Sequence, residues 1–205
     1  MQINQIKINS NNLIYLLLLS MPICAIAGNL LINLNIIFTS LIGCFIIIKK
    51  KEFVFFKKNS ELLFLILFFL IIFLISIILQ TSVSKVLLLI KFLLFTFTIV
   101  YFFKNNEKPI SKIFLFYGIV CLILSIDVIF QSYFYKNILG FVNNCEYNSS
   151  FYGEEKLAGF HILYFSFFAI FFLPNIFKNK IYKNLLLLIL LVIFPLSIFL
   201  SLNRI

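Results

Sequence analysis

The hydrophobic positions of this chain form long continuous runs that do not alternate with polar positions. Within a bilayer only helices or closed barrels satisfy the backbone, and the missing period of two excludes a barrel. A helix that crosses the hydrocarbon layer needs about 20 mostly apolar residues. Five runs each have the length of one span, and they cover residues 62–79, 86–103, 113–130, 158–177 and 185–202.

The first apolar stretch, Leu13–Ile48, is too long for one crossing. At 1.5 Å per residue it would reach roughly 54 Å as a single helix. Gly28-Asn29 supplies the residues of a tight turn near its middle. We therefore expect a hairpin of two short helices, 13–27 and 30–48, and seven spans in total.

Composition supports the same class of protein. The 205 residues are 63% hydrophobic and 12% charged, against about 45–50% and about 25% in soluble domains. A mean hydropathy of +1.13 excludes a water-soluble globular domain. The sequence thus predicts an all-α, polytopic transmembrane bundle that forms a single membrane domain over residues 1–205 and whose main partner is the lipid bilayer.

The positive charges indicate how the spans are oriented. Loops that stay in the cytoplasm carry an excess of Lys and Arg. With a cytoplasmic N-terminus, the inner segments hold 12 of the 17 basic residues and the outer segments hold Lys85, Lys136, Lys156 and Arg204. The net charge of +10 is therefore mostly a topology signal, and we expect no nucleic-acid partner. The inner residues are Lys7, Lys49, Lys50, Lys51, Lys57, Lys58, Lys104, Lys108, Lys112, Lys178, Lys180 and Lys183.

The N-terminus has an alternative interpretation. Lys7, an apolar core at 13–19 and the triplet Ala25-Ile26-Ala27 also fit a secretory signal with its cleavage site. Cleavage after Ala27 would place the next apolar run at the mature terminus. Both interpretations stay open at this stage.

Metal and nucleotide chemistry have little support in the sequence. There are four Cys without paired spacing and one His, which excludes a His/Cys zinc site. No GxxxxGK[ST] or GxGxxG motif occurs. We therefore expect neither a metal nor a cofactor.

The outer loop 131–157 is the longest connection, and an acidic residue precedes it within a span. Asp127 lies on the same helix face as Gln131, four residues later. Ionisable residues inside spans usually face the protein interior or a watery cavity. Lys91 enters the preceding span at similar depth, so one interpretation is a Lys91–Asp127 pair. The alternative is that Lys91 reaches the outer interface and Asp127 is hydrated there.

Three segments of the chain resemble the bacterial O-antigen ligase and O-antigen polymerase membrane proteins. Asp127…Gln131…Gly140 is similar to the "D-x-x-x-Q…G" entry to that family's first notable periplasmic loop. Residues 149–159, SSFYGEEKLAG, are similar to its "S-G-F-F-G-D-E-x-x-A-G" pattern, and residues 200–204, LSLNR, resemble its "L-S-G-x-R". The paired short helices at the N-terminus fit the same family.

The chain departs from the family pattern at several positions. Ser150 and Leu202 stand where the family has glycine, and Tyr147-Asn148 stand where it commonly has an Arg. Members of the family continue past the Arg motif with further spans and a large periplasmic loop, whereas this sequence stops at Ile205. The resemblance therefore leads us to expect the N-terminal half of such a protein, inactive by itself.

The resemblance implies a glycosyltransferase of the bacterial inner membrane. Such a protein moves a glycan from an undecaprenyl-diphosphate carrier to lipid A-core or to a growing polysaccharide at the periplasmic face. Guanidinium binds phosphate oxygens in bidentate fashion, so Arg204 and Lys91 are the candidate ligands of the diphosphate. The catalytic residues are unknown, and the candidates are Arg204, Glu154, Glu155 and Asp127.

Each of these residues also has an ordinary structural interpretation. Arg204 can be a charge that flanks a helix end, Glu154 and Glu155 can be solvated loop acids, and His161 can anchor span six at the interface. The whole loop can be a surface loop held by its aromatic residues. The alternative for the whole chain is a non-catalytic polytopic membrane protein: a remnant, an assembly subunit or a small-solute permease.

Overall fold

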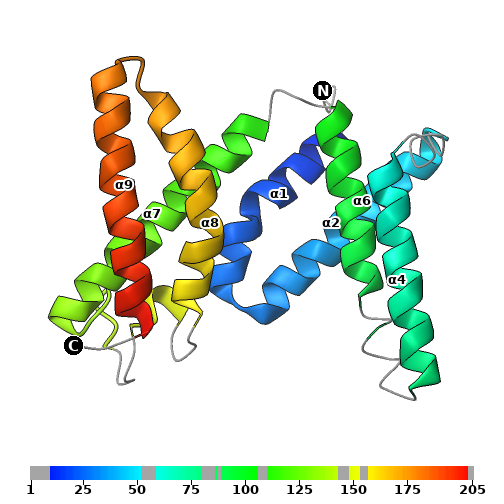
Figure 1. Ribbon diagram of the computed structural model, residues 1–205, viewed down its shortest axis with the longest axis horizontal. Coiled ribbons are helices and arrows are strands. Elements are labelled where there is room, and N and C mark those ends of the chain that lie inside the picture. The colour runs from blue at the N-terminus through cyan, green and yellow to red at the C-terminus, as the bar shows by residue number, and fades with distance from the viewer. Residues whose placement is uncertain are drawn as a thin grey trace, which may run out of the picture. The chain divides into compact units, whose positions relative to one another are not determined.

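In the residues that the computed structural model describes, the regular secondary structure is helical, without a strand (Figure 1). These are residues 10–51, 59–79, 86, 89–105, 110–142, 148–152 and 157–202. Its longer helices are α1 (Ser10–Ala27), α2 (Asn29–Lys49), α4 (Ser60–Ile78), α6 (Ile90–Asn105), α7 (Ile110–Phe134), α8 (Ala158–Phe172) and α9 (Lys180–Leu202). Two short 3-10 helices, η1 (Ser150–Tyr152) and η2 (Leu173–Ile176), accompany them.

A helix occupies each of the seven predicted spans. Five helical segments in the described ranges are long and apolar enough to cross a membrane: 29–49, 60–78, 110–134, 158–176 and 180–201. The all-helical class is therefore confirmed, and the length and composition of these helices support a membrane protein. The total of seven crossings and the side on which each terminus lies stay predictions.

The predicted turn at Gly28 is present. Helix α1 ends at Ala27, α2 begins at Asn29, and Gly28 has a φ of +120°, which favours glycine. The hairpin is held by a polar side chain in the apolar layer, because Asn35 donates to the Leu17 carbonyl at 3.0 Å and to the Ser20 hydroxyl at 2.9 Å. The expected hairpin is thus confirmed, and the Asn35 amide hydrogen-bonds its two helices to each other.

The packing divides the chain into two compact units. Unit 1 contains Met1–Met21 and Asn29–Glu107, and unit 2 contains Pro22–Gly28 and Lys108–Ile205. The first division falls within α1 at Pro22, where the missing N–H removes one bond of the helix ladder.

In unit 1, α2 and α6 approach closely at a glycine. A Cβ atom added to Gly43 would lie 2.1 Å from Oγ1 and 2.2 Å from Cγ2 of Thr98. Ser40, one turn earlier, donates to the Lys91 carbonyl of α6 at 3.2 Å. Small residues at such positions let transmembrane helices come close enough for dispersion contacts and hydrogen bonds.

We expect the Gly43→Ala variant to lose about 1–3 kcal/mol of the free energy of unfolding, the usual cost of overpacking a close contact. Adding Thr98→Gly removes all three of the atoms that the new methyl group would meet. The double variant should therefore regain much of the loss in a thermal-unfolding measurement in detergent. Equal stability of the single variant and the parent would contradict the close α2–α6 contact.

The contacts in unit 1 also give the helix directions. Lys91, at the start of α6, donates to Asn33 near the start of α2, while Lys50, just after α2, lies 5.9 Å from the ring of Tyr101 near the end of α6. The two helices are therefore parallel. Lys104 donates to Asn59, so α4 begins beside the end of α6 and runs in the opposite direction. These directions agree with the alternating topology predicted from the charges.

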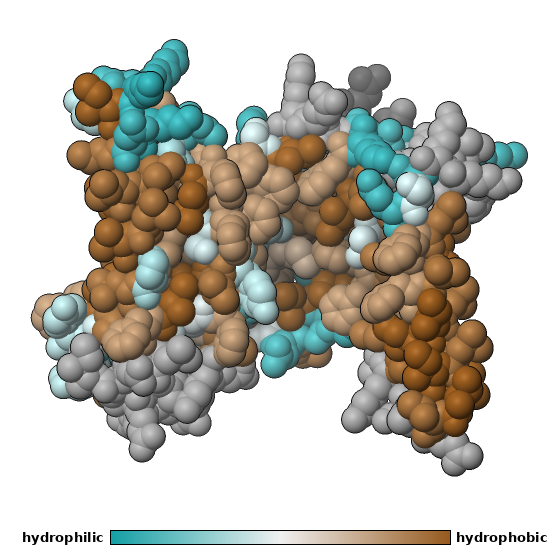
Figure 2. Space-filling model, in the orientation of Figure 1, coloured by the Kyte–Doolittle hydropathy of each residue, from teal (hydrophilic) through white to brown (hydrophobic). Residues whose placement is uncertain are grey.

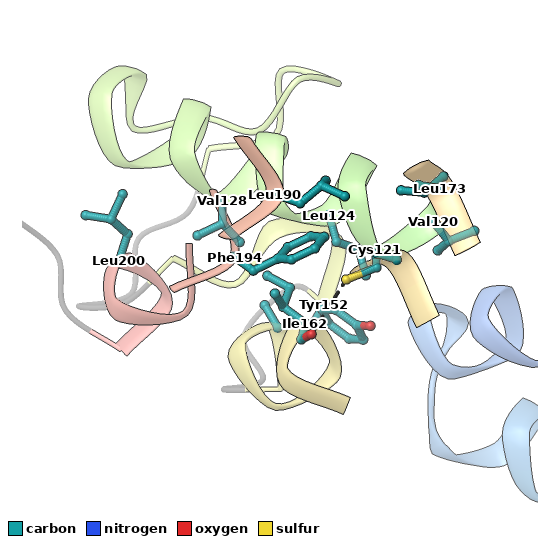
Figure 3. Packing of buried hydrophobic residues seen from close by; sticks show 12 residues of the cluster. Val120, Cys121, Leu124, Val128, Tyr152, Ile162, Leu173, Leu190, Phe194 and Leu200 are labelled. Carbon is teal, nitrogen blue, oxygen red and sulfur yellow. Dashed lines mark hydrogen bonds between the residues drawn. The ribbon is translucent and has the colours of Figure 1, made fainter. Parts of the chain in front are cut away.

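Unit 2 is built on three helices, α7, α8 and α9, with a shared apolar core (Figure 3). Helices α7 and α8 are antiparallel: Gly118 faces Ala169, and the Cys121 thiol lies 3.6 Å from the Ile162 carbonyl. The fully buried core residues include Cys121, Val128, Ile162, Ala169 and Leu190. This core holds the three helices together. Most of the buried polar residues of the unit lie at one end of it.

Helix α7 is longer than the predicted span 113–130. It begins at Ile110 and ends at Phe134, so the predicted loop 131–157 starts too early. The reason is that Gln131 and Ser132 are buried by the folded loop, 1% and 7% exposed, and remain helical although they are polar. Hydropathy alone places them outside the span.

The surface colouring agrees with a membrane environment (Figure 2). Hydrophobic side chains cover α4 and α9, and hydrophilic ones gather at the turn between α8 and α9. That turn holds Lys178 and Lys180, both exposed. Helix α4 exposes large apolar side chains such as Phe64 and Phe68 over most of its length, as expected for a helix in contact with lipid.

Candidate functional site

Most of the buried polar residues of unit 2 gather at one end, where α7 and α9 end and α8 begins. The described parts of the long loop, 135–142 and 148–152, fold onto this end. The lysine-rich turn between α8 and α9 lies at the opposite end of the same helices. The three sequence segments that carry the family resemblance all reach the first end.

Asp127 is the central polar residue of this site. Its side chain is 0% exposed although it lies on an otherwise apolar helix. One carboxylate oxygen accepts the backbone N–H of Ile138 at 2.6 Å, and the other accepts the hydroxyl of Ser150 at 2.6 Å. Asp127 therefore hydrogen-bonds two parts of the loop, at Ile138 and at Ser150, to α7.

Gln131 binds the same part of the loop. Its Oε1 atom accepts the N–H of Ser150 at 2.8 Å. Ser150 has a φ of +53°, which L residues other than glycine rarely adopt. The side-chain bond to Asp127 and the backbone bond to Gln131 together hold Ser150 in this conformation. The sequence prediction that Asp127 and Gln131 share one helix face is confirmed, since both reach the same residue.

Asn148 and Gly159 connect the loop and α8 to the end of α9. The Asn148 amide donates to the Leu200 carbonyl at 2.7 Å. Its buried Oδ1 atom accepts no hydrogen bond from the described residues. A Cβ atom on Gly159 would lie 2.2 Å from the Ser201 hydroxyl, so α8 and α9 are in close contact here. The end of α9 is therefore fixed against both segments.

Tyr152 and His161 form a second polar contact at this end. The Tyr152 hydroxyl and Nδ1 of His161 are hydrogen-bonded, and the two ring centroids lie 4.9 Å apart. Tyr152 is buried, and burial raises the pKa of its phenol, which stays neutral. His161 thus lies at the start of α8 as predicted, with a specific partner that hydropathy did not indicate.

Lys91 has its own partners in unit 1. Its ammonium donates to Oδ1 of Asn33 at 2.6 Å and lies 4.9 Å from the centroid of the Phe92 ring. Asp127 belongs to unit 2 and accepts from two donors there. The Lys91–Asp127 pair would join the two units, and it stays a prediction.

The other candidate residues lie outside the described residues. These are Arg204, Glu154 and Glu155, and their assignments as diphosphate ligand or catalytic groups stay predictions. The described residues nearest to them in sequence are Tyr152 and Leu157 on one side and Leu202 on the other. Tyr152 and Leu157 contribute to the apolar core of unit 2.

Sequence reasoning missed part of this site. Asp127 and Gln131 were found because polar residues within an apolar span are unusual. Asn137 was not found, because a single Asn in a loop carries no distinctive signal, and Asn148 was noted only because it stands where the family commonly has an Arg. Ser150 was noted only as a departure from glycine, yet its positive φ shows why that position favours glycine.

Comparisons with known proteins give no match. No protein-family model, no curated protein and no solved structure matches this chain.

Proposed function

We propose that this chain is an O-antigen ligase-like or O-antigen polymerase-like membrane protein. In this role it takes part in transferring a glycan from an undecaprenyl-diphosphate carrier to lipid A-core or to a growing polysaccharide. The protein would be a multi-pass protein of the bacterial inner membrane, with the site at its periplasmic face. The proposal rests on the residues at one end of unit 2 and on the resemblance of the segments that meet there.

One observation carries the proposal: the three segments that resemble the family's motifs are joined by hydrogen bonds and close contacts. Asp127 and Gln131 of the first segment bind Ser150 of the second. Gly159 of the second segment contacts Ser201 of the third. The directions of α7, α8 and α9 already bring the three segments to one end, so the support lies in the direct bonds of Asp127 and Gln131 to Ser150.

The buried contacts suggest different roles for the candidates. Asp127 is a positioning residue, because both of its oxygens hold the loop and its side chain is fully buried. Contacts with the substrate would then be made by residues of the loop and by residues that follow α9. In the proposal Glu154 or Glu155 is the candidate base for the acceptor hydroxyl, and Arg204 binds the diphosphate.

Binding of the carrier lipid tests the proposal. The full chain in nanodiscs is offered undecaprenyl diphosphate, undecaprenyl phosphate and phosphatidylglycerol, and bound lipid is counted by native mass spectrometry. We expect preference for the diphosphate. The Arg204→Gln variant should bind it roughly 10–100-fold more weakly, since one charge-assisted contact contributes about 1.5–3 kcal/mol.

Lys136→Gln is the matched control, because it removes one positive charge from the predicted outer loop at a position with no role in the proposed diphosphate site. It should leave the preference for diphosphate unchanged. Equal binding of the three lipids, with no effect of Arg204→Gln, would contradict the proposal and support the non-catalytic alternative.

A further inference from the structure

The loop that follows α7 turns back along the helix that it leaves. Tyr135 has a φ of +58° and donates its N–H to the Gln131 carbonyl at 2.9 Å, which ends the helix and reverses the chain. Three residues later the N–H of Ile138 reaches Asp127. Asp127 lies seven residues before the end of α7, about 10 Å back along the helix axis. The loop therefore descends toward the membrane instead of extending away from it.

The descending segment, residues 135–142, is called the apolar loop below. It exposes large apolar side chains: Leu139 at its tip is 67% exposed, and Phe141 and Val142 on the returning arm are 68% and 69% exposed. Lys136, paired with Val142 at the base, is exposed as well. Asn137, in contrast, is 4% exposed. In a soluble protein such a cluster would be an unfavourable surface, whereas at membrane depth it lies in its preferred environment.

The backbone of the apolar loop is largely satisfied from within. Asn137 exchanges bonds with the other arm, because its N–H donates to the Phe141 carbonyl at 3.0 Å and its Oδ1 accepts the Phe141 N–H at 2.9 Å. Gly140 donates to the Asn137 carbonyl at 2.9 Å and has a φ of +87°. Ile138 donates to Asp127. Paired amides are the requirement for placing a non-helical segment in a layer poor in water.

We infer that the apolar loop inserts into the headgroup and upper acyl region of the bilayer, held at that depth by the bond from Ile138 to Asp127. The occupant of its exposed face is phospholipid, because the large exposed side chains of the segment are apolar apart from Tyr135 and Lys136, and the depth set by Asp127 is that of the membrane interface. The long Lys136 side chain can place its ammonium at the level of the lipid phosphates while its stem stays in the apolar layer. Interfacial segments typically bury their apolar face about 5–10 Å into this boundary. The inference does not depend on the proposed glycan chemistry.

The sequence offers a clean probe of this depth, because the chain contains no Trp. In the Leu139→Trp variant of the full chain, the single tryptophan reports the surroundings of the loop tip. The variant is placed in phosphatidylcholine–phosphatidylglycerol nanodiscs that contain lipids with a nitroxide near the glycerol or near the end of the acyl chain. We expect blue-shifted emission, protection from aqueous iodide and stronger quenching by the shallow nitroxide.

Ile138→Pro tests the role of the Asp127 bond. Ile138 is the second residue of the turn closed by Gly140 and Asn137, a position where proline is favoured. The substitution removes the N–H that Asp127 accepts, keeps an apolar side chain at this position and leaves Asp127 able to bond to Ser150. Combined with Leu139→Trp, it should shift emission to the red, raise iodide quenching and weaken quenching by the shallow nitroxide.

Leu188→Trp is the matched control, since this residue lies within α9 and is 65% exposed on its apolar surface. Its tryptophan should be quenched more by the deep nitroxide and should not respond to Ile138→Pro. The inference is overturned if the Leu139→Trp variant is quenched freely by iodide and not by either lipid, which would leave the loop tip for water or a protein partner. It is also overturned if Ile138→Pro leaves the depth of the tip unchanged.

Discussion

The Asp127→Ala variant is expected to lose about 2–6 kcal/mol of the free energy of unfolding of unit 2, since each buried donor left without an acceptor costs about 1–3 kcal/mol. Two donors are affected, the Ile138 N–H and the Ser150 hydroxyl. Cys121, a free thiol with 0% exposure in the core of this unit, provides the measurement. The temperature at which maleimide labels Cys121, resolved by peptide mass spectrometry, should fall.

Two control variants separate this effect from a general loss of charge. Asp127→Asn keeps one carbonyl oxygen as an acceptor and should lose clearly less stability than Asp127→Ala. Glu61→Ala removes an exposed acid at the start of α4 and should leave the labelling temperature of Cys121 unchanged. Identical labelling of Asp127→Ala and the parent chain would show that the loop is held by other contacts.

Gly118→Ala is expected to separate α7 from α8 and to lose about 1–3 kcal/mol through overpacking. The added Cβ atom would lie 2.8 Å from the Cα atom of Ala169 and 3.1 Å from Cγ of Leu173. Backbone atoms of a packed helix cannot turn aside as the end of a flexible side chain can. Thermal unfolding in detergent, followed by the labelling of Cys121, measures the loss.

The direction of this effect distinguishes packing from helix propensity. In an exposed helix, replacing glycine by alanine gains about 1 kcal/mol, so a loss at Gly118 reports the contact with α8. Ile119→Ala is the control, because it changes the next residue of α7, whose side chain is 38% exposed and partly faces lipid. It alters α7 without adding an atom at the contact with α8. A gain of stability in Gly118→Ala would refute the close α7–α8 contact.

Most of the helices could be predicted from hydropathy because a membrane protein must satisfy its backbone within each span. The turn at Gly28 was predicted for a similar reason, since an apolar stretch of that length cannot cross once. The end of α7 could not be predicted in this way. Gln131 and Ser132 are polar, and only the loop folded over them keeps them buried and helical.

The site was only half visible in the sequence. Asp127 attracts attention because a buried carboxylate in an apolar helix is costly unless it is paired. Its partners are a backbone N–H and a serine hydroxyl, 11 and 23 residues further along the chain. Backbone donors carry no sequence signature, and the path of a loop is set by contacts that hydropathy does not encode. The spacing left a lysine partner and a hydrated carboxylate both open, and neither interpretation pointed to the two uncharged donors of the loop.

The parallel packing of α2 and α6 has a consequence for the order of assembly during synthesis. Parallel neighbours must be separated by a helix that returns across the membrane, so α2 reaches its partner only after α4 and α6 have been made. The Asn35 side chain of α2 can form its hydrogen bonds before α6 is made, because the Leu17 carbonyl and the Ser20 hydroxyl of α1 accept its amide protons. The α1–α2 hairpin can thus enter the bilayer as a pair with this amide paired, whereas Ser40 and Gly43 meet α6 only as the last helix of unit 1 leaves the insertion machinery.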